Sequence, residues 1–129
     1  MKKDEIAKIM EKALKTQEPV TFRDRPCFLT PLTYMDDLVL ASLVQEVCTD
    51  AMKAGLTDDT VNRAGFMANV LGVVKLSLHD TETGELVFNT MDEINAATNG
   101  NLADYKRIQD LYQFYMGALE LTREEKKSS

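Results

Sequence analysis

The C-terminal stretch LADYKRIQDLYQFYMGALELTREEKKSS, residues 102–129, decides the fold, because it reads as one long amphipathic helix. Its large apolar side chains recur at intervals of three and four, so they share one helical face. They are Leu102, Tyr105, Ile108, Leu111, Tyr112, Tyr115 and Leu119. From Arg123 onward the charged sequence REEKKSS offers nothing to bury. We therefore expect a docked helix that ends in a flexible charged tail over residues 123–129.

The rest of the chain has the composition of one folded domain, which we place at residues 1–122. A chain of 129 residues suits a single domain. Apolar residues make up 44% and charged residues 28%, a balance that fits a globular protein better than a disordered or fibrous one. The net charge of -6 argues against a nucleic-acid partner, since phosphate binding needs clustered Lys and Arg.

Neither a membrane segment nor a secretion signal is predicted. The longest apolar-rich run, residues 66–78, is too short to span a bilayer and contains Asn69 and Lys75. Charges are threaded through the N-terminal residues, unlike the apolar centre of a signal peptide. Cys27 and Cys48 are too few for a disulfide framework, so we expect buried thiols in a reducing cytoplasm that pack as small apolar groups.

The first 30 residues predict a short helix and a hairpin. Asp4 can cap a helix from Glu5 to about Lys15, and we treat residues 1–16 as a detachable N-terminal helix. The sequence PVTFRDRPCFL, residues 19–29, then predicts a small hairpin with a solvated Arg-Asp-Arg tip. Because an isolated hairpin is marginal in water, it must pack on helices or pair elsewhere.

Two longer helices follow. Thr33 with Asp36 three residues later is typical of a capping box, and Gly55 favours a helix end after Ala54. The dense apolar residues between them predict a central helix that is contacted on more than one side.

Thr57 opens a third helix that we expect to run to about Leu78. Gly72 in its middle predicts the close approach of another backbone. Residues 79–88 predict a loop or a second small hairpin, and residues 91–98 a short helix. The fold class is therefore mainly α, with four to five helices in one domain and one or two short β-hairpins.

No residue pattern indicates catalysis, a cofactor or a metal. His79 is the only histidine, and we interpret it as a solvated loop residue, which leaves no histidine pair for a metal site. Asp80, Glu82, Gly84 and Glu85 resemble a calcium loop only in part, because the glycine stands at the fifth position and not the sixth. Phosphate-loop and nucleophile-elbow motifs do not occur.

The order of the segments resembles the tail assembly chaperones of long-tailed bacteriophages. An extended segment, PVTFRDRPCFLTPLT (residues 19–33), leads into an apolar helix. A strand-like stretch, VKLSLHDTETGELVF (residues 74–88), follows, and a terminal helix runs into REEKKSS. The motifs are the Thr-Pro-Leu-Thr entry to a helix at Thr30–Thr33 and the Gly-Glu turn within residues 76–88. The resemblance covers most of the chain from Glu18 onward.

The resemblance implies a function. Such proteins are made in the cytoplasm of the infected bacterial host and are not enzymes. They bind the tape measure protein and keep it soluble while subunits of the tail tube protein polymerise around it. It further implies a longer product made by translational frameshifting, for which the Lys126 and Lys127 pair is compatible with a slippery sequence. We also expect self-association, through helix exchange or strand addition.

We expect the client to contact amphipathic helix surfaces at both ends of the chain. The candidate protein-binding residues are Ile6, Ile9, Met10, Ala13, Tyr112, Tyr115 and Met116. The alternative is that these side chains complete the core. Two other functions stay open: another structural protein of the phage tail or head-tail connector, and a small enzyme or ligand-binding domain that uses residues 80–85.

Overall fold

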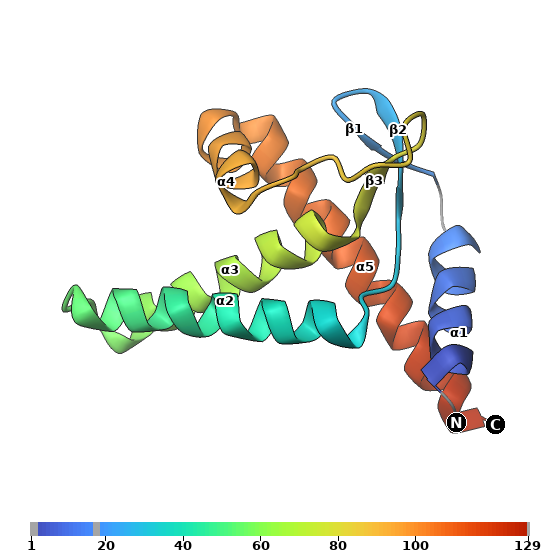
Figure 1. The fold of residues 1–129 in the computed structure, drawn as a ribbon, viewed down its shortest axis with the longest axis horizontal. Helices are drawn as coiled ribbons and strands as arrows, with labels where there is room; N and C mark the ends of the chain where they lie inside the picture. The colour runs from blue at the N-terminus through green and yellow to red at the C-terminus, as the bar shows by residue number, and fades with distance from the viewer. Residues whose placement is uncertain (1–2, 17–18, 129) are drawn as a thin grey trace.

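The chain folds into five α-helices and one three-stranded antiparallel sheet over residues 3–16 and 19–128, which the computed structural model describes (Figure 1). The helices are α1 (Lys3–Thr16), α2 (Tyr34–Lys53), α3 (Asp58–Ser77), α4 (Met91–Gly100) and α5 (Leu102–Ser128). The strands are β1 (Val20–Phe22), β2 (Arg25–Leu29) and β3 (Leu78–Asp80). The predicted mainly helical class is confirmed. The predicted cap at Asp4 is wrong, because α1 begins one residue earlier, at Lys3.

The sheet has the order β1-β2-β3, so the predicted hairpin gains a third strand from the far end of α3. The hairpin turns at Arg23 and Asp24, which have φ angles of 52° and 63°. Two successive positive φ angles are typical of a type I′ turn, whose twist matches that of the paired strands. The interpretation of His79 as a solvated loop residue is wrong. His79 lies in β3, half-buried, and stacks on Phe28 with ring centroids 5.1 Å apart.

Helix α5 organises the core, as its sequence predicted. It packs against α1, α3, α4 and β1, and Ile108 and Leu111 are completely buried. Leu102 does not join this face, because it stands at the exposed start of the helix with 67% of its surface accessible. The helix continues to Ser128, and the flexibility expected of residues 123–129 stays a prediction.

Helices α2 and α3 form an antiparallel pair that projects from the rest of the molecule (Figure 1). The predicted capping box of α2 is confirmed: the Asp36 N–H donates to Thr33 Oγ1 at 3.1 Å, and the Thr33 N–H donates to Asp36 Oδ2 at 3.0 Å. The predicted end of α2 is also confirmed by Gly55, which has a φ of 77°. The side chain of Thr57 caps α3.

The two helices approach closely at Gly65 and Gly72 of α3. A Cβ atom at Gly65 would lie 2.6 Å from Cys48 Sγ, and one at Gly72 would overlap the Leu40 side chain. The close approach predicted at Gly72 is therefore confirmed, but a leucine side chain makes it and not a backbone. These glycines let α2 lie against α3 along most of its length.

The prediction that α2 is central is wrong. Only Leu40 and Ala51 of α2 are buried, whereas nine residues of α3 are. The apolar residues of α2 cover two sides of the helix, and the structure packs only one of those sides against α3. The other side faces outward, and it forms the candidate site.

Candidate protein-interaction surface

Four large apolar side chains lie exposed on the first turns of α2, and we call them the α2 outer face. Tyr34, Met35, Leu38 and Val39 keep 62%, 64%, 47% and 55% of their surface accessible. Because a helix turns by about 100° per residue, Met35 and Leu38 point away from the side that buries Leu40. Single exposed apolar residues are ordinary on proteins, but a contiguous group marks a candidate interaction site.

A groove of about 420 Å³ adjoins this face, between α1 and the start of α2. We call it the α1–α2 groove. Its walls are mostly apolar: Ile6, Ala7, Met10, Pro31, Leu32, Thr33, Tyr34 and Asp37. Tyr34 belongs both to the groove and to the α2 outer face, so the two form one continuous surface. A partner on α2 could therefore place a side chain in the groove.

A second groove, of about 570 Å³, runs along the neighbouring side of α2 toward Asn69 of α3. Asp37 lines both grooves, so it stands where they meet. Ala41 and Val44 give this second groove apolar walls. The apolar surface thus continues past the α2 outer face along the helix.

The charge on this part of α2 has one sign. From Tyr34 to Asp50 the helix carries Asp36, Asp37, Glu46 and Asp50 and no Lys or Arg. Asp36 and Asp37 lie in the first turn, where carboxylates stabilise the helix dipole. A partner with positive charge beside its apolar residues would be attracted to this surface.

Tyr115 of α5 fixes the segment that leads into α2. The Leu32 N–H donates to the Tyr115 hydroxyl at 2.8 Å. Burial raises the pKa of Tyr115 to about 12, so the hydroxyl stays neutral at physiological pH. Because Leu32 also lines the α1–α2 groove, this hydrogen bond holds one wall of the groove in place.

The structure separates the predicted binding residues into two groups. In α1, Ile6 and Met10 line the α1–α2 groove, although Met10 is buried, and Ile9 and Ala13 are half-buried. In α5, Tyr112 and Tyr115 belong to the core and Met116 lies at its edge. The binding role of either group stays a prediction.

Tyr112 and Tyr115 are 7% and 5% exposed, so in this conformation a partner cannot reach their rings. The Asn69 side-chain amide donates to the Tyr112 hydroxyl at 3.2 Å. Met116 is half-buried and packs against the core. Sequence reasoning missed the α2 outer face, although the surplus of apolar residues in α2 was the signal for it.

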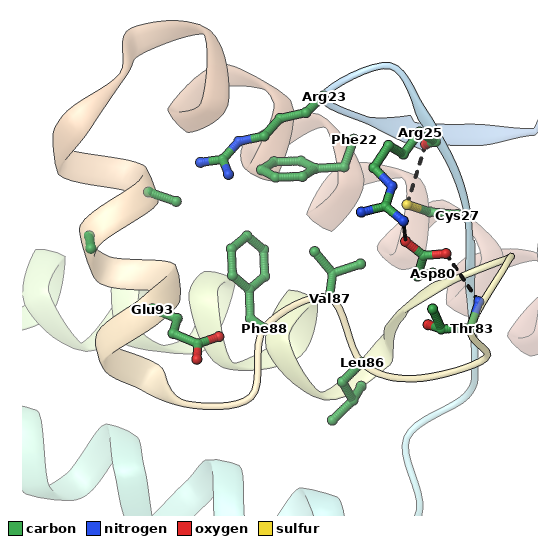
Figure 2. Close-up of a pocket in the computed structure, with 12 residues that line it drawn as sticks. Phe22, Arg23, Arg25, Cys27, Asp80, Thr83, Leu86, Val87, Phe88 and Glu93 are labelled. Carbon is green, nitrogen blue, oxygen red and sulfur yellow. Dashed lines mark hydrogen bonds and ion pairs between the residues drawn. The ribbon is translucent and has the colours of Figure 1, made fainter.

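A different cleft, of about 660 Å³, lies between the hairpin, the β3–α4 loop and α4 (Figure 2). The hairpin tip is exposed, as expected, with the Arg23 and Arg25 side chains each 59% accessible, but both arginines also form ion pairs that were not predicted. Arg23 Nη2 lies 2.7 Å from Asp104 Oδ2, and Arg25 Nη2 lies 2.8 Å from Asp80 Oδ2. The hydrogen bond to Asp104 raises the pKa of the Arg23 guanidinium. These ion pairs fasten the hairpin to α5 and to β3.

The carboxylate of Asp80 also holds the loop after β3. Asp80 Oδ1 accepts hydrogen bonds from the N–H groups of Glu82 and Thr83, at 2.8 and 3.3 Å. Both oxygens of Asp80 are therefore engaged with protein groups, in the turn whose sequence resembles a calcium loop. Within the described residues, no group of three or more His, Cys, Asp or Glu side chains could hold a metal ion.

Both cysteines are free, as predicted, but only Cys27 is buried as expected, whereas Cys48 is half-buried. Cys27 borders the cleft, where burial raises the pKa of its thiol, and Sγ donates to the Arg25 carbonyl at 3.5 Å. The thiol is thus protonated at neutral pH and unsuited to act as a nucleophile. Phe22 and Phe88 pack edge to face in the same cleft, with centroids 5.3 Å apart (Figure 2). We interpret the cleft as a structural junction.

Comparisons with known proteins found no match. No protein-family model, no curated protein and no solved structure matches the chain. Among the described residues, no helix is both long and apolar enough to cross a membrane. The α2 outer face with its grooves is therefore the candidate functional site.

Proposed function

We propose that this protein is a phage tail assembly chaperone, which binds the tape measure protein and keeps it soluble while the tail tube assembles. The observation that carries the proposal is the α2 outer face, four large apolar side chains that the folded chain leaves about half exposed. A tape measure protein is a long, largely helical chain, so it offers apolar helix faces to such a surface.

The size of the surface suits reversible binding. Burying a side chain such as Leu or Val fully contributes about 1.5–3 kcal/mol. Covering the exposed part of the α2 outer face would therefore contribute roughly 3–7 kcal/mol, before the cost of association is subtracted. A chaperone must release its client when the tube forms, and this modest gain permits release.

The order of segments supports the same proposal. The extended segment before α2, the strand-like turn after α3 and the long terminal helix are the features through which the sequence resembles the phage tail chaperones. On this proposal the protein is not an enzyme, acts in the cytoplasm of the bacterial host and self-associates. It meets the tail tube protein during assembly, and a minority of copies are extended by frameshifting near Lys126.

Co-expression tests the proposal. The partner is the product of the long, helix-rich reading frame expected beside this gene. We expect its soluble yield to rise and the two proteins to co-purify, relative to co-expression with an unrelated acidic helical protein. An unchanged soluble yield together with no co-purification would contradict the proposal.

A further inference from the structure

We propose that the α2 outer face binds an amphipathic helix that carries Lys or Arg beside its apolar residues. The name of the client rests on the function proposed above, whereas the chemistry of the bound segment is read from the surface itself. The shape of the face fits such a helix, its charge attracts Lys and Arg, and a second copy of this chain fits it poorly.

The shape of the face fits a helix. Met35, Leu38 and Val39 stand at positions i, i+3 and i+4, and form a ridge of the kind that packs against another helix. Peptides that bind as strands need an open sheet edge, and α2 offers none because its backbone hydrogen bonds are internal. The α1–α2 groove beside Tyr34 can take a side chain from the incoming helix.

The charge of the face selects a basic partner. Asp36 and Asp37 lie in the first turn of α2 and Glu46 and Asp50 further along it, and the only basic residue of the helix is Lys53 in its last turn. Basic residues that flank the apolar positions of a client would meet these carboxylates. Acidic residues in the same places would be repelled.

A second copy of this chain is a poor occupant. Two α2 outer faces packed together would bring two acidic helices against each other, neither of which has a basic residue before Lys53. Helix α1 does combine apolar and basic residues, but its Met10 and Leu14 are already buried in its own domain. The structure therefore favours a different protein on this face.

Peptide binding to the full-length chain tests the inference. The probe is a fluorescent synthetic amphipathic helix of about 18 residues, long enough to be helical, with Leu on one face and Lys beside it. The matched peptides replace every Lys by Glu, or scramble the order so that no apolar face forms. We expect the Lys peptide to bind at least about tenfold more tightly than either, and added salt to weaken it.

Variants of the protein locate the site. Leu38→Glu should weaken binding of the Lys peptide at least about tenfold, as expected for the centre of an interface. The control is Leu102→Glu, which changes an equally large exposed side chain at the start of α5 and should leave binding unchanged. The double variant Glu46→Gln with Asp50→Asn should weaken binding roughly two- to tenfold, because it removes two charges and little apolar surface. Thermal unfolding checks that each variant is folded.

Three results would overturn the inference: equal affinity for the Lys and Glu peptides, unchanged affinity of Leu38→Glu, or self-association that Leu38→Glu abolishes while no peptide binds. The two proposals fail separately. If the tape measure protein is captured equally well by Leu38→Glu, the inference is wrong and the chaperone role stands. If the peptides behave as expected and the tape measure protein is not captured, the chaperone role is wrong and the inference stands.

Discussion

The hydrogen bond from Leu32 to Tyr115 allows the sharpest prediction about the fold. Tyr115→Phe keeps the buried ring and removes only the hydroxyl that accepts the Leu32 N–H at 2.8 Å. An N–H that loses its partner costs about 1–3 kcal/mol, and Leu32 is half-buried, so water can replace part of the bond. We expect a loss of about 1–2 kcal/mol in the free energy of unfolding, or about 4–7 °C in Tm for a chain of this size.

The same variant predicts a pH dependence. The pKa of Tyr115 is raised in the folded state to about 12, from an ordinary value of about 10. The neutral phenol is therefore favoured by folding, and its contribution is complete below pH 10 and lost as the pH rises toward 12. The stability difference between the wild type and Tyr115→Phe should shrink over this interval, by roughly 2 kcal/mol at most.

Urea unfolding followed by circular dichroism, at neutral pH and in steps up to pH 11, measures both effects. The matched control is Tyr105→Phe on the same helix, whose hydroxyl accepts a hydrogen bond from the neighbouring Gln109 amide at 3.1 Å, one turn along the helix. We expect this control to change stability by less than about 0.5 kcal/mol. A Tm of Tyr115→Phe within 1 °C of the wild type corresponds to a loss of less than ~0.3 kcal/mol in the free energy of unfolding. That result would refute the proposed anchoring of the groove wall.

Three further predictions concern the elements that hold the fold together. Thr33→Ala should destabilise the protein by about 1 kcal/mol in thermal unfolding, because the capping box loses its hydroxyl; no loss would mean that the cap is not formed in solution. Gly65→Val should cost at least about 2 kcal/mol, since its side chain would meet Cys48 Sγ, and a wild-type Tm would contradict the close packing. Arg25→Gln should cost about 1 kcal/mol at low ionic strength and less at high salt, because Asp80 loses its ion pair; a salt-independent loss would assign the effect to packing.

Local signals in the sequence were sufficient for most of the secondary structure. Thr33 and Asp36 form reciprocal hydrogen bonds within one turn, and Gly55 ends α2 through its own backbone conformation. The two ends of α2 therefore do not depend on distant residues. The spacing of Ile108 and Leu111 likewise identifies the buried side of α5 without any knowledge of its neighbours. Such features are readable because the interacting groups are close in the chain.

The errors concern contacts between residues far apart in the chain. Arg23 and Asp104 are 81 positions apart, and nothing in the hairpin sequence indicates that its arginine has a partner in α5. The third strand was not predicted for the same reason. His79 in β3 pairs with Phe28 in β2, and the two residues are far apart in the sequence. Arg23 stays exposed as expected while it pairs with Asp104, whereas His79 becomes half-buried in the sheet.

The candidate site was misplaced for a related reason. Sequence reasoning counted the apolar residues of α2 correctly and assumed that the domain itself would cover them. The structure covers the side with Leu40 and leaves Met35 and Leu38 exposed. It also turns Tyr112 and Tyr115 inward. A surplus of apolar side chains predicts that a second surface is needed, but periodicity alone cannot say whether that surface belongs to the same chain.

Site-specific photocrosslinking with the co-expressed tape measure protein tests the central claim most directly. A photoreactive amino acid would replace Met35 on the α2 outer face or, as the control, Leu102, which is equally exposed at the start of α5. We predict a crosslinked complex from position 35 and none from position 102. Crosslinking from position 102 alone, or equally from both positions, would contradict the claim that α2 presents the client-binding surface.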